Sequence, residues 1–480
     1  MIRVYLDWNI ISNLKRDQFS EVRTFFESNQ DRLLFLYSPA HFTDLMKSEN
    51  GDNPFFQQDL HMLETLCGKH LIEPGEGQAV PKFCTPLAYY ETYDRGSSSN
   101  NMIDIDQVFN FLDQEGAELG LGKIGDKLRN LFSAIPSAIP MDDTTKDFRK
   151  IFLPDLNEQS SQLDVLRSTG KMMSQLIGDK EFYKGLRKSI SENGLQLDQN
   201  SGNWEPEEVI ANIDAFLLNT GLQKDFLGYI DYIYELRNEK PDHMTYFSEC
   251  YNMLDLMGYK SDKLPKPTDT AMNIYTDAQH AYYAGYCDFF VVEDKNLSTK
   301  SQVLFRKFGL KVRVLAAKDC IREISQVLWD HQQDSLELNF FERAMKVFES
   351  GKIEKTVASD SQIDAYFLVS ELPVRYFDYF THAVVYEQKN EGKRTLFFRR
   401  MVDNFSNFHY YTELEHLYRK IATFFGWTDH IDFEQIDRNI YANEQVEIGF
   451  SYPFGTVGIQ YTEDGTRNAL LVYTLDIRKE

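Results

Sequence analysis

The sequence lacks two features that would place the chain in or across a membrane. It contains no run of about 18 consecutive apolar residues, the length that a helix needs to cross a bilayer. It also opens directly on a strand-like stretch at residues 2–6, which leaves no room for the charged segment and apolar core of a signal peptide. These absences predict a protein with no membrane partner.

Cysteine is scarce and irregularly placed. The five cysteines are odd in number, and no two of them form a Cys-x-x-Cys pair. This argues against both a disulfide framework and a zinc ribbon. A reducing compartment follows, and we expect a cytoplasmic location.

Positive charge is also in short supply, because 51 Lys and Arg face 74 Asp and Glu, for a net charge of −23. A protein with this balance repels a polyanion unless local basic strips overcome the average. The charge therefore counts against loose binding to long duplexes. It does not exclude a small substrate-binding face that divalent metals neutralise.

The two ends of the first 330 residues show an α/β pattern. Near the N-terminus, short apolar runs at residues 3–6 and 33–37 predict strands, and each is followed by a helical segment. The alternation returns with strands expected at residues 289–292 and 312–315. Continuous apolar runs of this length are typical of a parallel sheet that is buried on both faces.

The rest of the chain is different in character. Residues 51–269 read as mainly helical, with helices expected at residues 55–71, 103–119, 162–177, 181–192, 207–219 and 224–237. We therefore predict an α/β parallel-sheet domain, split into residues 1–50 and 270–330 by a large helical insertion. An α+β C-terminal domain of unknown role follows at residues 331–480. Within it we expect helices at residues 336–348 and 362–387 and a hairpin at residues 455–476.

Four aspartates are placed where they could meet at one edge of the predicted sheet. Asp7 and Asp294 follow expected strands, Asp44 lies in the second turn of a helix after a strand, and Asp277 lies in the first turn of a helix expected at residues 276–285. Sites in parallel sheets form at the carboxyl ends of the strands. Asp288 begins a strand, so we expect it at the opposite edge.

A cluster of carboxylates predicts a metal site. Like charges a few ångströms apart do not all stay ionised without a cation. Oxygen ligands suit Mg²⁺ or Mn²⁺, which lower the pKa of bound water and hold the attacking and leaving oxygens of a phosphodiester. For any single aspartate, a helix cap or a turn is the alternative role.

The segments around the first two acids have a shared pattern. In residues 4–9 a hydrophobic strand ends in Asp7, with Asn9 two residues on. In residues 37–45 a strand is followed by a serine-capped helix that carries Asp44. Both segments resemble the opening motifs of the PIN-domain nucleases, although that family often carries glutamate in place of Asp44.

The segments around the other two acids extend this resemblance. In residues 276–284 Asp277 opens a helix of small and aromatic residues. In residues 287–297 a strand ends in Asp294, with Glu293 where family members often have threonine. The resemblance covers residues 1–50 and 270–328, about a quarter of the chain, and the long insertion departs from the family pattern.

The resemblance implies a Mg²⁺- or Mn²⁺-dependent endonuclease that acts on single-stranded or structured RNA. It implies that Asp7, Asp277 and Asp294 hold metal and that Asp44 completes the shell. Candidate substrate contacts are Asn9, His280 and Lys295. For each of them a purely structural role, as a turn, packing or surface residue, is the alternative.

Several alternatives remain open. By analogy, a nuclease with large extra regions suits a regulated toxin-type or antiviral defence effector that has a protein partner or inhibitor. A non-catalytic binding or scaffold protein, a DNA nuclease and a phosphatase are the competing functions. The basic stretch at residues 393–400 and the aromatic stretch at residues 405–411 could hold nucleic acid, but a solvated strand and ordinary packing are favoured.

Overall fold

The computed structural model forms two compact units. The first comprises Met1–Glu91, Asp242–Met244 and His280–Glu480, and the second comprises Thr92–Pro241 and Thr245–Gln279. The structure describes residues 1–47, 49, 55–93, 105–106, 109–110, 113, 124–136, 155–157, 159–192, 196–220, 223–237, 240–263, 271–335, 354–356, 365–388, 393–401, 403–442, 444–453, 455–461 and 469–476.

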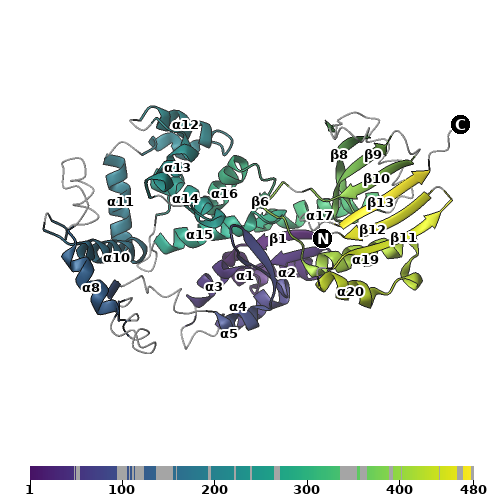
Figure 1. Ribbon diagram of the computed structural model, residues 1–480, viewed down its shortest axis with the longest axis horizontal. Helices are drawn as coiled ribbons and strands as arrows, with labels where there is room; N and C mark the ends of the chain where they lie inside the picture. The colour runs from purple at the N-terminus through teal and green to yellow at the C-terminus, as the bar shows by residue number, and fades with distance from the viewer. Residues whose placement is uncertain are drawn as a thin grey trace. The chain divides into compact units, whose positions relative to one another are not determined.

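A four-stranded parallel sheet lies in the first unit (Figure 1). Its strands, in spatial order, are β2 (Leu33–Leu36), β1 (Ile2–Leu6), β5 (Phe289–Val291) and β6 (Arg313–Leu315). All residues of β1, β2 and β5 are buried, as their continuous apolar runs predict. In register, Val4 pairs with both Phe35 and Phe289. The prediction of a parallel α/β sheet from residues distant in the chain is confirmed.

Helices follow the strands and bring polar residues to the carboxyl edge of the sheet. They are α1 (Trp8–Asn13), α3 (Pro39–Met46), α16 (Lys295–Lys307) and α17 (Ala317–Ser335), which come after β1, β2, β5 and β6 respectively. The start of α3 is fixed locally, because Ser38 and His41 form a capping box and Pro39 occupies the first helical turn. Two other helices at this edge, α1 and α17, begin two residues after the ends of their strands.

The helix expected at residues 55–71 is shorter than predicted. Helix α4 (Phe55–Cys67) ends before Gly68, whose positive φ of 55° suits a glycine at a helix C-terminus. An antiparallel hairpin follows, formed by β3 (His70–Pro74) and β4 (Ala79–Phe83). The apolar residues keep helical spacing past Gly68 in the sequence, and for this reason strand β3 was not predicted.

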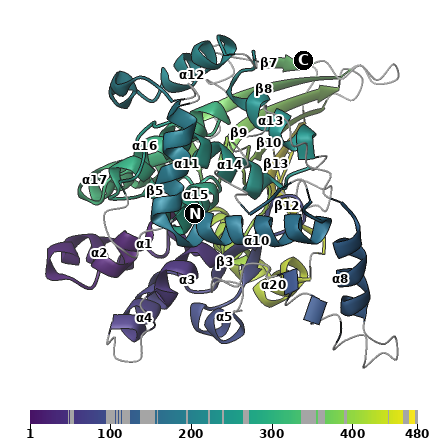
Figure 2. The same ribbon diagram turned by 90° about the vertical axis from the view of Figure 1, so that its left-hand side faces the viewer.

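The second unit is helical in the described ranges, as expected for this part of the chain. Its helices, coloured blue to teal in Figures 1 and 2, include α8 (Ile124–Ala134), α10 (Gln162–Gly178), α11 (Lys180–Glu192), α12 (Val209–Leu218) and α13 (Phe226–Arg237). A buried carboxylate, Asp255, accepts hydrogen bonds from the Tyr183 hydroxyl at 2.8 Å and from Arg187. Most of the helix expected at residues 103–119 lies outside the described residues.

The C-terminal region of the first unit contains a seven-stranded sheet. Its order is β11 (Val446–Tyr452), β12 (Gly455–Tyr461), β13 (Ala469–Asp476), β10 (Lys393–Arg399), β9 (Phe380–Gln388), β8 (Ala365–Tyr376) and β7 (Glu354–Thr356), with every pair antiparallel. Helices α19 (Tyr411–Phe425) and α20 (Phe433–Tyr441) share its hydrophobic core (Figure 1). The hairpin expected at residues 455–476 is confirmed as β12 and β13, while its turn and the helix expected at residues 336–348 lie outside the described residues.

The helix expected at residues 362–387 is wrong, because these residues form the hairpin of β8 and β9. The segment is rich in aromatic and β-branched residues, and Pro373 lies within it, which disfavours a continuous helix. The chain reverses at Phe377 and Asp378, whose φ angles of 54° and 56° are those of a type I′ turn. Neither residue is glycine or asparagine, so the usual sequence signal of this turn is missing.

A buried ionic cluster connects the amino edge of the parallel sheet to the C-terminal region. Glu413, in α19, accepts hydrogen bonds from Arg3 Nε at 3.0 Å and from Arg400 Nη1 at 3.2 Å, and all three residues are buried. Burial alone would raise the pKa of Glu413, but Arg3 and Arg400 outweigh it and hold the pKa well below its usual value.

Among the helices of the described ranges, none has both the length and the apolar character to cross a bilayer.

Candidate acidic site

Asp7 is a buried carboxylate at the carboxyl end of β1, one of the two inner strands of the parallel sheet. It follows β1 directly, its backbone N–H donates to Val291 O at 2.9 Å, and only 2% of the residue is exposed. Asn9 Nδ2 donates to Asp7 Oδ2 at 3.2 Å. Burial, reinforced by the nearby negative charge of Asp44, raises the pKa of Asp7 to about 6, although His280 opposes this shift.

Asp44 lies beside Asp7, in the last part of helix α3. Its Oδ2 accepts from His280 Nε2 at 3.0 Å, and its Oδ1 accepts from Lys47 Nζ at 2.6 Å. Burial would raise the pKa of this carboxyl, but the His280 hydrogen bond and the Lys47 ammonium outweigh it and lower the pKa to about 2. The two neighbouring acids therefore have pKa values shifted in opposite directions.

His280 is held in place by Tyr5, a residue of strand β1. Its side chain is fully buried, and its Nδ1 lies 2.9 Å from the Tyr5 hydroxyl. The same hydroxyl lies 2.6 Å from Ser38 Oγ, at the start of α3. Because Nε2 of His280 faces a carboxylate, it carries a hydrogen, and in the neutral ring Nδ1 accepts from Tyr5. This orientation fixes His280 on Asp44.

A second histidine, His41, forms a hydrogen bond at the carboxyl end of β1. The backbone N–H of Ser38 donates to His41 Nδ1 at 3.1 Å, so Nε2 carries the hydrogen and donates to Leu6 O at 2.8 Å. Burial and the neighbouring His280 lower the pKa of His41 to about 3, which keeps the ring neutral. Tyr5 and His41 were not among the predicted site residues. The only available signal was a hydroxyl in an otherwise apolar strand and a histidine inside the second motif.

Asp294 has a structural role in addition to the one predicted. It is the N-cap of α16, and its Oδ1 accepts from the N–H groups of Asn296 at 2.7 Å and Leu297 at 2.9 Å. The residue is exposed and lies beyond β5, the strand next to β1. Both capping bonds use Oδ1, so capping does not require Oδ2. The helix-cap alternative therefore holds for Asp294, whatever its part in chemistry.

Substitution of Asp294 separates these two roles. We expect Asp294→Ala to lower the free energy of unfolding by about 1 kcal/mol, because α16 loses its cap. Asp294→Ser should fold like the wild type, since serine also caps helices, while removing the charge. Thermal unfolding followed by circular dichroism measures the first effect. If Asp294→Ser loses as much stability as Asp294→Ala, the carboxylate does more for the fold than capping.

Asp277 lies in the part of its helix that belongs to the second unit, whereas Asp7 and Asp44 belong to the first. The helix that carries it, α15 (Ala271–Ala284), begins five residues before the expected Thr276. Asp277 is therefore in the second turn and not in the first, because the helical pattern extends toward the N-terminus through residues 271–275. The prediction that Asp277 holds metal stays a prediction.

The candidate substrate contacts differ in accessibility. Asn9 is exposed on α1, although it donates to Asp7, and Lys295 is exposed as the first residue of α16. His280 is buried and bonded to Asp44, so it supports the acid and does not face solvent. Lys300, one and a half turns beyond Lys295, is fully buried and is not a surface contact for phosphate.

The fit of a divalent ion to these residues is partial. Across the described part of the chain, no group of three or more His, Cys, Asp or Glu is arranged to hold a metal ion. Asp7 and Asp44 are neighbours, and two carboxylates are enough: Mg²⁺ commonly keeps several waters and is bound by one or two carboxylates plus substrate phosphates. The pair of carboxylates therefore fits one such ion, and the four-aspartate site stays a prediction.

The stretches that could have held nucleic acid are occupied by packing. In β10, Leu396 and Phe398 are in the core of the C-terminal sheet, and Arg400 pairs with Glu413. Phe405 packs against Tyr282 and Tyr286, at ring-centroid distances of 5.8 and 5.5 Å. The packing alternative accounts for Phe405. Residues 393–399 form a strand as expected, but this strand is not solvated, because it lies between β13 and β9 and its side chains Leu396 and Phe398 are buried, as is Arg400.

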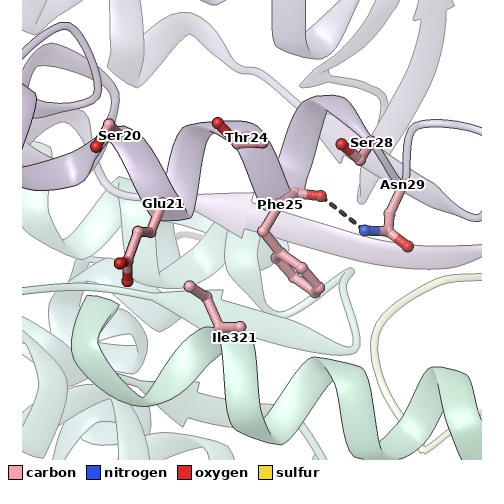
Figure 3. Close-up of a pocket in the computed structure, with 7 residues that line it drawn as sticks. All are labelled: Ser20, Glu21, Thr24, Phe25, Ser28, Asn29 and Ile321. Atoms are coloured by element: carbon pink, nitrogen blue, oxygen red, sulfur yellow. Dashed lines mark hydrogen bonds between the residues drawn. The ribbon is translucent and has the colours of Figure 1, made fainter.

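A surface hollow of about 510 Å³ lies between α2 (Ser20–Glu27) and α17. Figure 3 shows Phe25 and Ile321 turned toward one another across it, with Ser20, Glu21 and Thr24 along the α2 side. None of its lining residues belongs to the acidic pair or to its hydrogen-bond network. Its chemistry is that of a shallow apolar surface, and we assign no reaction to it.

Comparison of the chain with protein-family models, with curated proteins and with solved structures gives no match. The geometry of the acidic pair and the resemblance of the four segments are therefore the features that point to a function.

Proposed function

We propose that this protein is a metal-dependent endoribonuclease with a PIN-like fold. The observation that carries the proposal is the buried Asp7, which directly follows β1, an inner strand of a parallel sheet, and lies next to Asp44. Perturbed acids in such a place are candidates for a functional site, because a purely structural role would not favour burying a carboxylate beside another one. The order of the four acids along the chain gives further support.

A divalent cation would relieve the strain in this pair. At neutral pH Asp7, with a pKa of about 6, is mostly ionised, and it lies beside an ionised Asp44. Two negative charges in a site with little water repel one another strongly. A Mg²⁺ or Mn²⁺ ion between them would offset this repulsion and, when bound, would activate a water molecule for attack on a phosphodiester.

The residues around the pair have supporting roles in this proposal. Asp7 and Asp44 bind the ion, and His280 orients Asp44 through Nε2 while Tyr5 fixes the ring. Lys295, exposed at the start of α16, would contact a substrate phosphate. Asp294 is a further candidate ligand through the oxygen that capping does not use.

The substrate and the cellular role are also part of the proposal. RNA is the substrate that the family resemblance implies, and a target that is compact suits a protein with a net charge of −23. A role as a regulated toxin-type or defence effector, with a protein partner or inhibitor, remains an analogy. All five cysteines are free thiols, which agrees with the proposed reducing, cytoplasmic setting.

The direct test is cleavage of labelled RNA, single-stranded DNA and duplex DNA with Mn²⁺ and with EDTA. We expect Mn²⁺-dependent RNA products from the wild type and a loss of about 10²- to 10³-fold in Asp7→Asn, the range for losing one electrostatic stabiliser of a transition state. Asp17→Asn, an exposed acid in a short 3-10 helix, is the matched control and should cleave normally.

Other outcomes would select the competing functions. Products from DNA alone would make the protein a DNA nuclease with the same acidic site. No metal-dependent product from any of the three substrates would leave the non-catalytic binding or scaffold protein. Equal activity in the wild type and Asp7→Asn would remove Asp7 from the mechanism.

A further inference from the structure

Lys47 pairs with Asp44, one of the two carboxylates that would bind the proposed metal ion. Its ammonium is 2.6 Å from Asp44 Oδ1, while the other oxygen of the same carboxylate is bonded to His280. Both oxygens of Asp44 therefore already have a cationic or N–H partner. A metal ion that takes the same lone pair of either oxygen competes with the partner already there.

The two partners of Asp44 are held very differently. His280 is fully buried and its second ring nitrogen is bonded to Tyr5, so a rotation away from Asp44 would leave buried polar atoms without partners. Lys47 follows the end of α3, and 44% of its side chain is exposed. Its ammonium can move into water at little cost. Of the two, Lys47 is the partner that yields.

We propose that Lys47 is a displaceable counter-ion that holds Asp44 in the metal-free protein and competes with the divalent cation for Oδ1. This inference rests on the proposed function in one respect, the binding of a divalent ion at Asp44. Its consequence is regulatory: at low metal concentration Lys47 stays paired with Asp44, and the metal ion binds only when it outcompetes the lysine. His280 remains on Oδ2 in both states and keeps the carboxylate oriented.

The test is the affinity of the full-length protein for Mn²⁺, measured from the electron paramagnetic resonance signal of free Mn²⁺. We expect Lys47→Met to bind Mn²⁺ about fivefold more tightly than the wild type, the upper range for a partly exposed ion pair. Lys184 forms the same kind of pair with the acid three residues before it, Glu181, on α11, so Lys184→Met is the matched control and should change the affinity by less than about twofold.

A double-mutant cycle sharpens the result. In an Asp44→Asn background, Lys47→Met should have no effect on Mn²⁺ binding, because the competed oxygen no longer carries charge. The proposal is overturned if Lys47→Met binds equally or more weakly, if Lys184→Met tightens binding as much as Lys47→Met, or if no variant binds Mn²⁺. Tighter binding by Lys47→Met without cleavage of any nucleic acid would support the counter-ion and reject only the nuclease.

Discussion

Asp7→Asn is expected to raise the free energy of unfolding of the metal-free protein by up to about 3 kcal/mol at pH 8. Burial lifts the pKa of Asp7 from 3.8 to about 6 in the folded protein. A raised carboxyl pKa means that folding disfavours the ionised form, so wild-type stability is lost as pH rises from about 4 to about 6. Asparagine carries no charge and escapes this loss.

Urea denaturation in EDTA at several pH values between 4 and 8 measures the effect. The advantage of Asp7→Asn should be near zero at pH 4 and should reach its full value above pH 6. Mn²⁺ should then stabilise the wild type and leave the variant unchanged, because a ligand stabilises only the form that binds it. An advantage of the same size at every pH would show that ionisation of Asp7 is not its cause.

Glu413→Gln is expected to lower the free energy of unfolding by about 3–5 kcal/mol, the range for breaking a buried ion pair. Glu413 is fully buried between Arg3 and Arg400, and glutamine would leave both guanidinium groups without their counter-charge. Arg3 lies in β1, so the loss should also loosen the strand that carries Asp7. Thermal and urea unfolding measure the change.

A neighbouring surface pair supplies the control for this prediction. Glu415 pairs with Arg419 one turn along the same helix, and both are partly exposed. Glu415→Gln should cost less than about 1 kcal/mol. A Glu413→Gln variant no less stable than Glu415→Gln would show that the cluster is not what joins β1 to the C-terminal region.

The two predictions describe opposite uses of buried charge. Glu413 has two guanidinium partners, and its pKa is lowered, so its charge supports the fold. Asp7 accepts a hydrogen bond from the neutral amide of Asn9, and burial raises its pKa, so its charge weakens the fold. A protein that keeps such a destabilising acid is expected to use it.

The parallel sheet was predictable because its strands are continuous apolar runs with helices between them. Residues 3–6 and 33–37 carry this pattern clearly, and β1 and β2 form there. The hairpin of β8 and β9 was not predictable from periodicity. Its apolar run fits a helix as well as a strand, and its turn places Phe377 and Asp378 at positive φ, where neither residue is usual.

The candidate site was predictable in part for a related reason. Asp7 and Asp44 were placed together by the rule that sites form at the carboxyl ends of parallel strands, and the structure agrees. Lys47 and Tyr5 were missed because their roles depend on contacts with Asp44 and His280 in three dimensions. The capping role of Asp294 was available from sequence, as an aspartate just before a helix.

Anomalous X-ray scattering from a crystal grown with Mn²⁺ tests the binding of a divalent ion by the acidic pair most directly. The account predicts a manganese peak within coordination distance of carboxylate oxygens of both Asp7 and Asp44, with the Lys47 ammonium displaced from Asp44. A crystal saturated with Mn²⁺ in which those two carboxylates contact no metal would contradict it.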